Sequence, residues 1–89
     1  MILMSIQHRV KDYDAWRKAF DGLAELRTKG GASEVVVMRA KNRPNLILVT
    51  SKFATVEEAQ ALNQNPERAE AMKGAGVIPP VRVEFYEEA

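Results

Sequence analysis

The chain has 89 residues, and its 13 basic and 12 acidic side chains leave a formal net charge of +1. This length fits a single domain over residues 1–89, and the interspersed charges exclude the basic stripe typical of a nucleic-acid-binding surface. The absence of cysteine excludes disulfides and thiolate ligands, and one histidine, His8, is too few for a transition-metal site. Because so small a domain has a thin stability margin without such staples, we expect a homodimer.

The chain carries no predicted membrane segment. Its apolar start, residues 1–4, is followed at once by polar and charged residues and does not have the pattern of a signal peptide. No apolar run approaches the roughly 20 residues that span a bilayer. We therefore expect no membrane partner, and the cytoplasm is the default location.

Residues 2–10 alternate apolar and polar side chains, which predicts a strand with one dry face. That face carries Ile2, Met4, Ile6, His8 and Val10.

A helix is predicted to follow, beginning after the cap residue Asp12 and ending at Gly30-Gly31. Its apolar stripe has helical spacing and contains Trp16, Phe20, Leu23 and Arg27.

The middle of the chain predicts a hairpin, with strands over residues 32–40 and 46–53 and a polar turn over 41–45. Both strands are apolar in either phase, so the pattern leaves open which of their side chains face the helices. Thr55 and Glu58 form a capping box that opens a second helix. Asn65-Pro66 restarts a short third helix, in which Ala69 and Met72 are expected to face inward.

A last strand is predicted over residues 81–87, with Val81, Val83 and Phe85 toward the helices. The order of elements predicts an α+β, ferredoxin-like β-α-β-β-α-β domain whose four-stranded antiparallel sheet has helices on one face. The other face has mixed polarity, with Arg9 and Tyr86 as candidate dimer contacts, and is expected to meet a second copy of the chain.

Several segments resemble a known family. These are residues 8–16 (HRVKDYDAW), Phe20-Asp21, Pro44-Asn45, and Met72 with residues 75–77. Over nearly the whole chain they are similar to the small dimeric α+β-barrel proteins, described as cyclase-like or antibiotic-biosynthesis-monooxygenase-like. The resemblance implies a homodimer whose two sheets form a shared barrel, with a ligand pocket between sheet and helices in each subunit.

The resemblance also implies a range of activities. Members include cofactor-independent quinol and anthrone monooxygenases, polyketide cyclases and haem-degrading enzymes. The last use an asparagine, tryptophan and histidine arrangement that this sequence does not match, so no haem is expected. Gly30-Gly31 follows a helix and is not part of a phosphate-binding loop, so no nucleotide is expected either. We therefore expect the protein to use no cofactor.

His8 is the candidate catalytic residue, because its side chain alone has an ordinary pKa near neutrality and can act as a general base. The alternative is a buried histidine bonded to a backbone carbonyl or to a neighbouring side chain. The candidate substrate-binding residues are Trp16, Phe20, Arg39 and Met72. For the three apolar residues the alternative is core packing, and for Arg39 it is an ion pair with a glutamate.

These residues lead to two hypotheses. The first is a dimeric barrel that binds a small, mostly apolar aromatic or polyketide-like molecule, as a cofactor-independent monooxygenase or polyketide cyclase. The second is a non-catalytic ligand-binding or assembly protein of the same fold.

Overall fold

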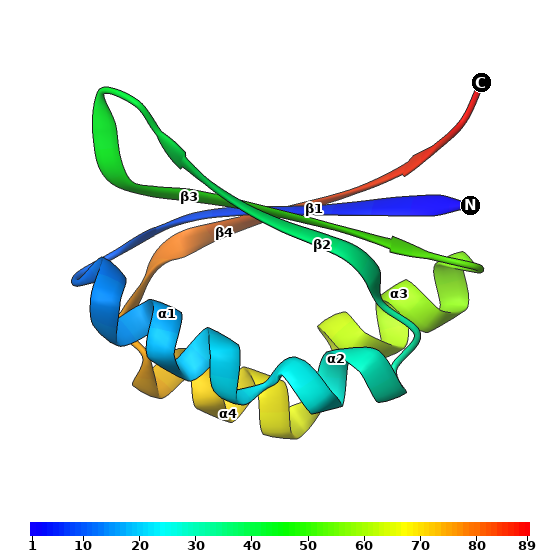
Figure 1. Cartoon of the computed structure of the whole chain (residues 1–89), viewed down its shortest axis with the longest axis horizontal. Helices are drawn as coiled ribbons and strands as arrows, with labels where there is room; N and C mark the ends of the chain where they lie inside the picture. The colour runs from blue at the N-terminus through cyan, green and yellow to red at the C-terminus, as the bar shows by residue number, and fades with distance from the viewer.

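The computed structural model describes residues 1–89 and contains four strands and four helices. Their order is β1 (Ile2–Val10), α1 (Tyr13–Gly22), α2 (Ala24–Lys29), β2 (Ser33–Ala40), β3 (Arg43–Phe53), α3 (Val56–Asn63), α4 (Pro66–Gly74) and β4 (Val77–Glu87). The strands form one antiparallel sheet in the order β2-β3-β1-β4. All helices lie on one face of this sheet (Figure 1), which confirms the α+β, ferredoxin-like fold. No helix is long and apolar enough to cross a membrane.

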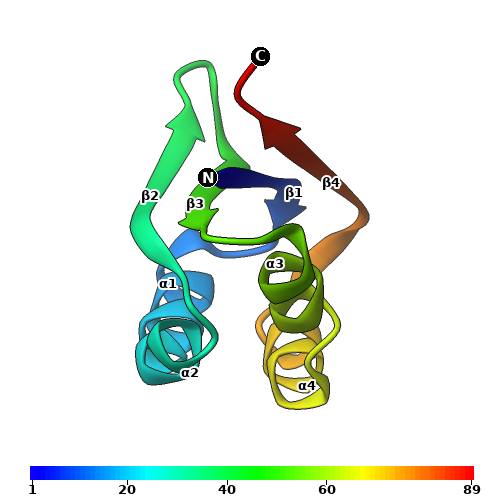
Figure 2. The same ribbon diagram turned by 90° about the vertical axis from the view of Figure 1, so that its right-hand side faces the viewer.

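The helices form two parallel rows beneath the sheet. Figure 2 shows α1 and α2 below the β2 side and α3 and α4 below the β4 side. Side-chain caps start three of the helices as the sequence predicts. Asp12 accepts a hydrogen bond from the backbone N–H of Asp14, Thr55 from that of Glu58, and Asn65 from that of Arg68.

The first predicted helix is in fact two. Leu23 leaves the helical conformation, with φ −99° and ψ 9°, directly after Gly22, a residue type that weakens helices. The break frees the Phe20 carbonyl, which accepts hydrogen bonds from the backbone N–H of Leu23 at 3.1 Å and from the Arg27 guanidinium at 2.7 Å. The interruption of the helix therefore turns Arg27 inward against the end of α1.

Two strands are longer than predicted. β3 begins at Arg43, so the turn is only residues 41–42, and β4 begins at Val77 and includes Pro79-Pro80. Prolines are tolerated there because β4 is an edge strand with one unpaired side. Its pairing with β1 shifts between Gln7 and Arg9. Val81, which the sequence places toward the helices, lies next to this shift and is 46% exposed, so it is not part of the buried core.

The register of the hairpin, which the sequence leaves open, is settled by burial. Ile47 and Val49 of β3 are buried under the helices, and Val37 of β2 pairs with Val49 on the same face. Leu48 and Met38, which pair with each other, therefore lie on the open face of the sheet.

The core is divided into two clusters of buried side chains. The first contains Ile2, Met4, Ile6, Phe53, Ala59 and Leu62. The second contains Val10, Trp16, Phe20, Ile47, Val49 and Ala75. The division leaves a place between sheet and helices where neither cluster fills the interior.

α4 departs from the predicted orientation. Ala69 is exposed, and the half-buried residues are Arg68, Ala71 and Met72, which are three and four positions apart on one face of the helix. The prediction for Ala69 is wrong because the inward face of α4 is turned by one residue. No side chain of α4 is fully buried.

Candidate functional site

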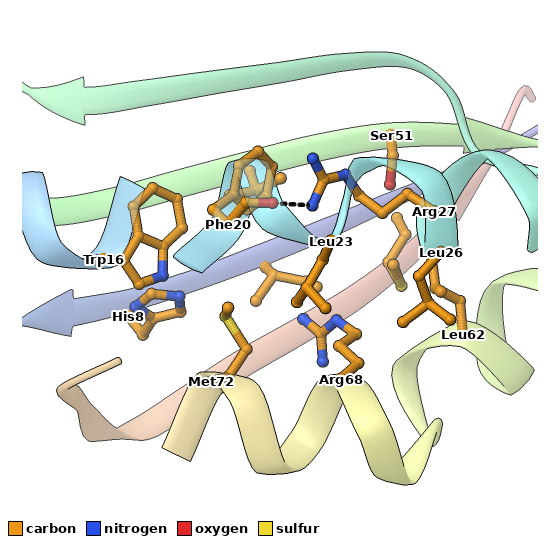
Figure 3. Close-up of a pocket in the computed structure, with 13 residues that line it drawn as sticks. His8, Trp16, Phe20, Leu23, Leu26, Arg27, Ser51, Leu62, Arg68 and Met72 are labelled. Carbon is orange, nitrogen blue, oxygen red and sulfur yellow. Dashed lines mark hydrogen bonds between the residues drawn. The ribbon is translucent and has the colours of Figure 1, made fainter. Parts of the chain in front are cut away.

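A cavity of about 30 Å³ lies where the two core clusters meet, between the sheet and α1, α2, α3 and α4 (Figure 3). Thirteen residues line it, nine of them hydrophobic, and none is an aspartate or glutamate. Its polar groups come from His8 on β1, Trp16 on α1, Arg27 on α2, Ser51 on β3 and Arg68 on α4. With its walls in place, the cavity has room for about two water molecules.

His8 occupies the cavity wall at the end near α1. Its side chain is 5% exposed, and its Nδ1 lies 3.3 Å from the Arg9 carbonyl oxygen. Because a carbonyl only accepts, Nδ1 carries the proton in this contact, and Nε2 keeps its lone pair. Burial lowers the pKa of His8, the hydrogen bond to Arg9 partly opposes this, and the positive charge of Arg68 lowers the pKa further. The imidazole is therefore neutral at pH 7 and can accept a proton.

Trp16 forms the aromatic wall beside His8. Its indole is 1% exposed, stacks on Phe20 at 4.9 Å between ring centroids, and meets the His8 ring edge-on at 5.7 Å. The indole Nε1–H is buried without a hydrogen-bond partner. A buried N–H of this kind is uncommon and leaves one donor free at the cavity for an acceptor atom.

The structure brings four of the five predicted site residues together. His8, Trp16, Phe20 and Met72 all line the cavity. Arg39 does not: its Nε donates to the Pro44 carbonyl at 2.8 Å, and its guanidinium lies over the Tyr13 ring at 3.8 Å. The expected ion pair of Arg39 with a glutamate is also absent, whereas Arg82 pairs with Glu84 at 3.3 Å.

Sequence reasoning missed two charged residues of the cavity, Arg27 and Arg68. The helical stripe contains Arg27 but gives no sign of its role. For Arg68, the only signal is its spacing of four residues from Met72, which puts both side chains on one helix face.

Acidification from about pH 7 to about pH 5.5 is expected to lower the free energy of unfolding through His8. The pKa of this group is lowered in the folded state, so the unfolded chain binds its proton at a higher pH and stability falls as the pH drops below about 6.5. Denaturant unfolding of the wild type and of His8→Gln at both pH values measures the effect.

The comparison isolates the imidazole, because His8 is the only histidine of the chain. The wild type should lose more stability than His8→Gln over this range. Equal losses in the two proteins would show that the imidazole titrates alike in the folded and unfolded states.

No family model and no curated protein matches the sequence. Solved structures do match the fold. SnoaB, a cofactor-independent oxygenase from Streptomyces nogalater, superimposes with a TM-score of 0.81 at 11% identity, covering 99% of this chain and 92% of that one. A conserved protein from Methanosarcina mazei Go1 gives a TM-score of 0.81 at 12% identity with the same coverage.

An antibiotic biosynthesis monooxygenase is similar over 100% of this chain and 99% of its own, with a TM-score of 0.79 at 10% identity. The chain therefore has the ferredoxin-like α+β fold of the antibiotic biosynthesis monooxygenases, as the resemblance in its sequence implies. At these identities the likeness concerns the fold alone.

Proposed function

We propose that this protein, as a single domain, binds a small, mostly apolar aromatic molecule in the cavity and oxygenates it without a cofactor. The observation that supports this most directly is the placement of a neutral imidazole against an aromatic wall in a water-poor interior. His8 supplies the base, and Trp16 and Phe20 supply flat surfaces for a ring.

The chemistry requires only a base, a dry cavity and dioxygen. Nε2 of His8 takes a proton from an electron-rich phenol or anthrone, and the resulting anion transfers electrons to dioxygen. One oxygen atom becomes the new ring carbonyl and the other leaves as water. A ring CH₂ that becomes a carbonyl supplies all four electrons, so no external reductant is needed. The protein contributes orientation and exclusion of bulk water.

Entry of a ring requires the cavity to widen, because about 30 Å³ is far too small for a bicyclic ligand. Met72 is the side chain best suited to move, since it is flexible and only half-buried. It belongs to α4, a helix with no buried residue. We therefore expect the ligand to enter by displacing α4 and not α1, whose inward side chains are buried.

Oxygen uptake with dithranol, a dihydroxyanthrone, tests the proposal. The wild type should accelerate uptake over the protein-free rate, and His8→Gln should lower this acceleration by about 10²–10⁴-fold, the usual contribution of a general base. Arg39→Gln, which changes a charge outside the cavity, is the control and should retain the full rate.

Failure of the wild type to accelerate uptake, with dithranol bound, would favour the second function, a non-catalytic ligand-binding protein of the same fold. One observation supports that alternative: the cavity has a single group that titrates near neutral pH and no carboxyl group beside it. A polyketide cyclase would use the same His8 and would show conversion of a polyketide without oxygen uptake.

We further propose that two chains associate through the open face of the sheet. This face has no helix over it (Figure 1) and carries apolar side chains on β2 and β3. Val36 and Met38 are 45% and 48% exposed, and Tyr86 on β4 is 52% exposed. Exposed apolar side chains on a sheet face without helices favour an interaction surface, and a symmetric pair of sheets would cover them.

A further inference from the structure

Two guanidinium groups face the cavity without a carboxylate partner. Arg68 is half-buried, and its side chain makes no hydrogen bond or ion pair within the chain. Arg27 donates one hydrogen bond to the Phe20 carbonyl and lies over the Phe20 ring at 3.7 Å. Asp21, an acidic residue of α1, is paired with Arg17 on the outside of the molecule at 3.0 Å.

Arginine is mostly exposed in folded proteins, whereas Arg27 and Arg68 are both partly buried against the cavity. Burial lowers the pKa of Arg68 and of Arg27, and the positive charges of Arg17 and Arg68 lower the pKa of Arg27 further. Asp21 acts on Arg27 in the opposite direction, but no acidic residue lines the cavity. The cavity lining therefore contains two guanidinium groups and no carboxylate.

We propose that Arg27 and Arg68 bind the carboxylate of the ligand, so that the molecule taken up is an aromatic carboxylic acid. This inference rests on the proposed function, because it assigns the ligand class of the same cavity. A carboxylate offers two oxygens that match the planar fork of a guanidinium. The hydrophobic lining suits the remainder of the ligand, a flat ring.

The two ends of the cavity have different characters. Figure 3 places Arg27 and Arg68 on opposite walls at one end, and His8 with Trp16 at the other. A ligand anchored by its carboxylate between the arginines extends its ring toward Trp16 and Met72. Its far end then reaches His8 and the unpartnered indole N–H of Trp16. The anion is thus held away from the base, and an acceptor such as a phenol or carbonyl oxygen meets the free donor.

Calorimetric titration with naphthoate and naphthamide, substituted at the same ring position, tests the inference. The two probes share a ring and differ in charge. The wild type should bind naphthoate about tenfold or more tightly than naphthamide. Arg68→Gln should weaken naphthoate binding by about 10–100-fold and leave naphthamide binding unchanged. Arg68→Lys, which keeps the charge, should recover part of the loss.

Arg17→Gln is the matched control. Arg17 also lies near the Phe20 ring, at 5.6 Å, but it is paired with Asp21 outside the cavity, so both probes should bind this variant like the wild type. Arg27→Gln is expected to behave like Arg68→Gln, and its folding must be checked by circular dichroism because Arg27 also caps α1.

The outcomes separate this inference from the proposed function. Equal affinity of the wild type for naphthoate and naphthamide would overturn the carboxylate subsite and leave aromatic binding in place. Binding of neither probe would overturn both. The selectivity of the wild type decides the matter even where an arginine variant fails to fold.

Discussion

Replacement of Trp16 by alanine is expected to lower the free energy of unfolding by about 3–5 kcal/mol, the usual cost of removing a large buried aromatic side chain. The indole is 1% exposed and contacts the rings of His8, Tyr13 and Phe20, so nothing nearby fills the space it leaves. In a domain of this size the loss corresponds to a fall of about 10–40 °C in Tm. Thermal unfolding followed by circular dichroism measures it.

Phe53→Ala provides the comparison that separates a core role of Trp16 from a role in binding. Phe53 is equally buried, at 1% exposed, but belongs to the first core cluster and does not line the cavity. Both variants should lose similar stability. At a temperature where both are folded, Phe53→Ala should still bind dithranol and Trp16→Ala should not. Equal binding by the two variants would show that Trp16 serves only in core packing and not in ligand binding.

Leu48→Asp is expected to dissociate the proposed dimer into single chains. Leu48 is half-buried on the open face and pairs with Gln7 on β1 and Met38 on β2, so it lies within that face and not at its edge. Between two sheets the new carboxylate would be desolvated and unpaired, which raises the dissociation constant by about 100-fold or more. Sedimentation equilibrium at micromolar concentration measures the change.

Two further variants define this surface. Tyr86→Asp, on β4, should weaken association less, because β4 is an edge strand and Tyr86 is already 52% exposed. Gln60→Asp adds the same charge on the exposed side of α3 and should have no effect. A wild-type protein that sediments as one compact chain throughout the micromolar range would remove the shared barrel from the proposal.

The elements that the sequence predicts well are those with a strong local signal. Burial alternates along β1 without interruption over residues 2–10, and the buried face is the predicted one, including His8. The helix starts depend on a side chain within three residues of the N–H it accepts from, so Asp12, Thr55 and Asn65 could be identified directly. The same local logic placed Trp16 and Phe20 on the inward face of α1.

The parts that failed depend on contacts between distant segments. Pattern puts Ala69 inward because it is apolar, whereas the packing of α4 turns Arg68 and Met72 toward the cavity. The hydrophobic periodicity of this helix is too weak to show which face is buried. Arg39 pairs with Ile47, which is buried in the second core cluster, but it stands over Tyr13 at the hairpin end and not at the cavity. Only the tertiary structure shows that Arg39 meets Tyr13, the first residue of α1, and lies outside the cavity lining.

The absence of any buried side chain on α4 has a kinetic consequence. A segment held by few buried contacts opens locally at a small free-energy cost. Since the closed cavity has no room for a ring, binding of the proposed aromatic ligand would require such an opening first. The observed rate constant of association would then level off at high ligand concentration, at the rate constant with which α4 opens. Opening of the protein, and not diffusion of the ligand, would limit the rate of binding.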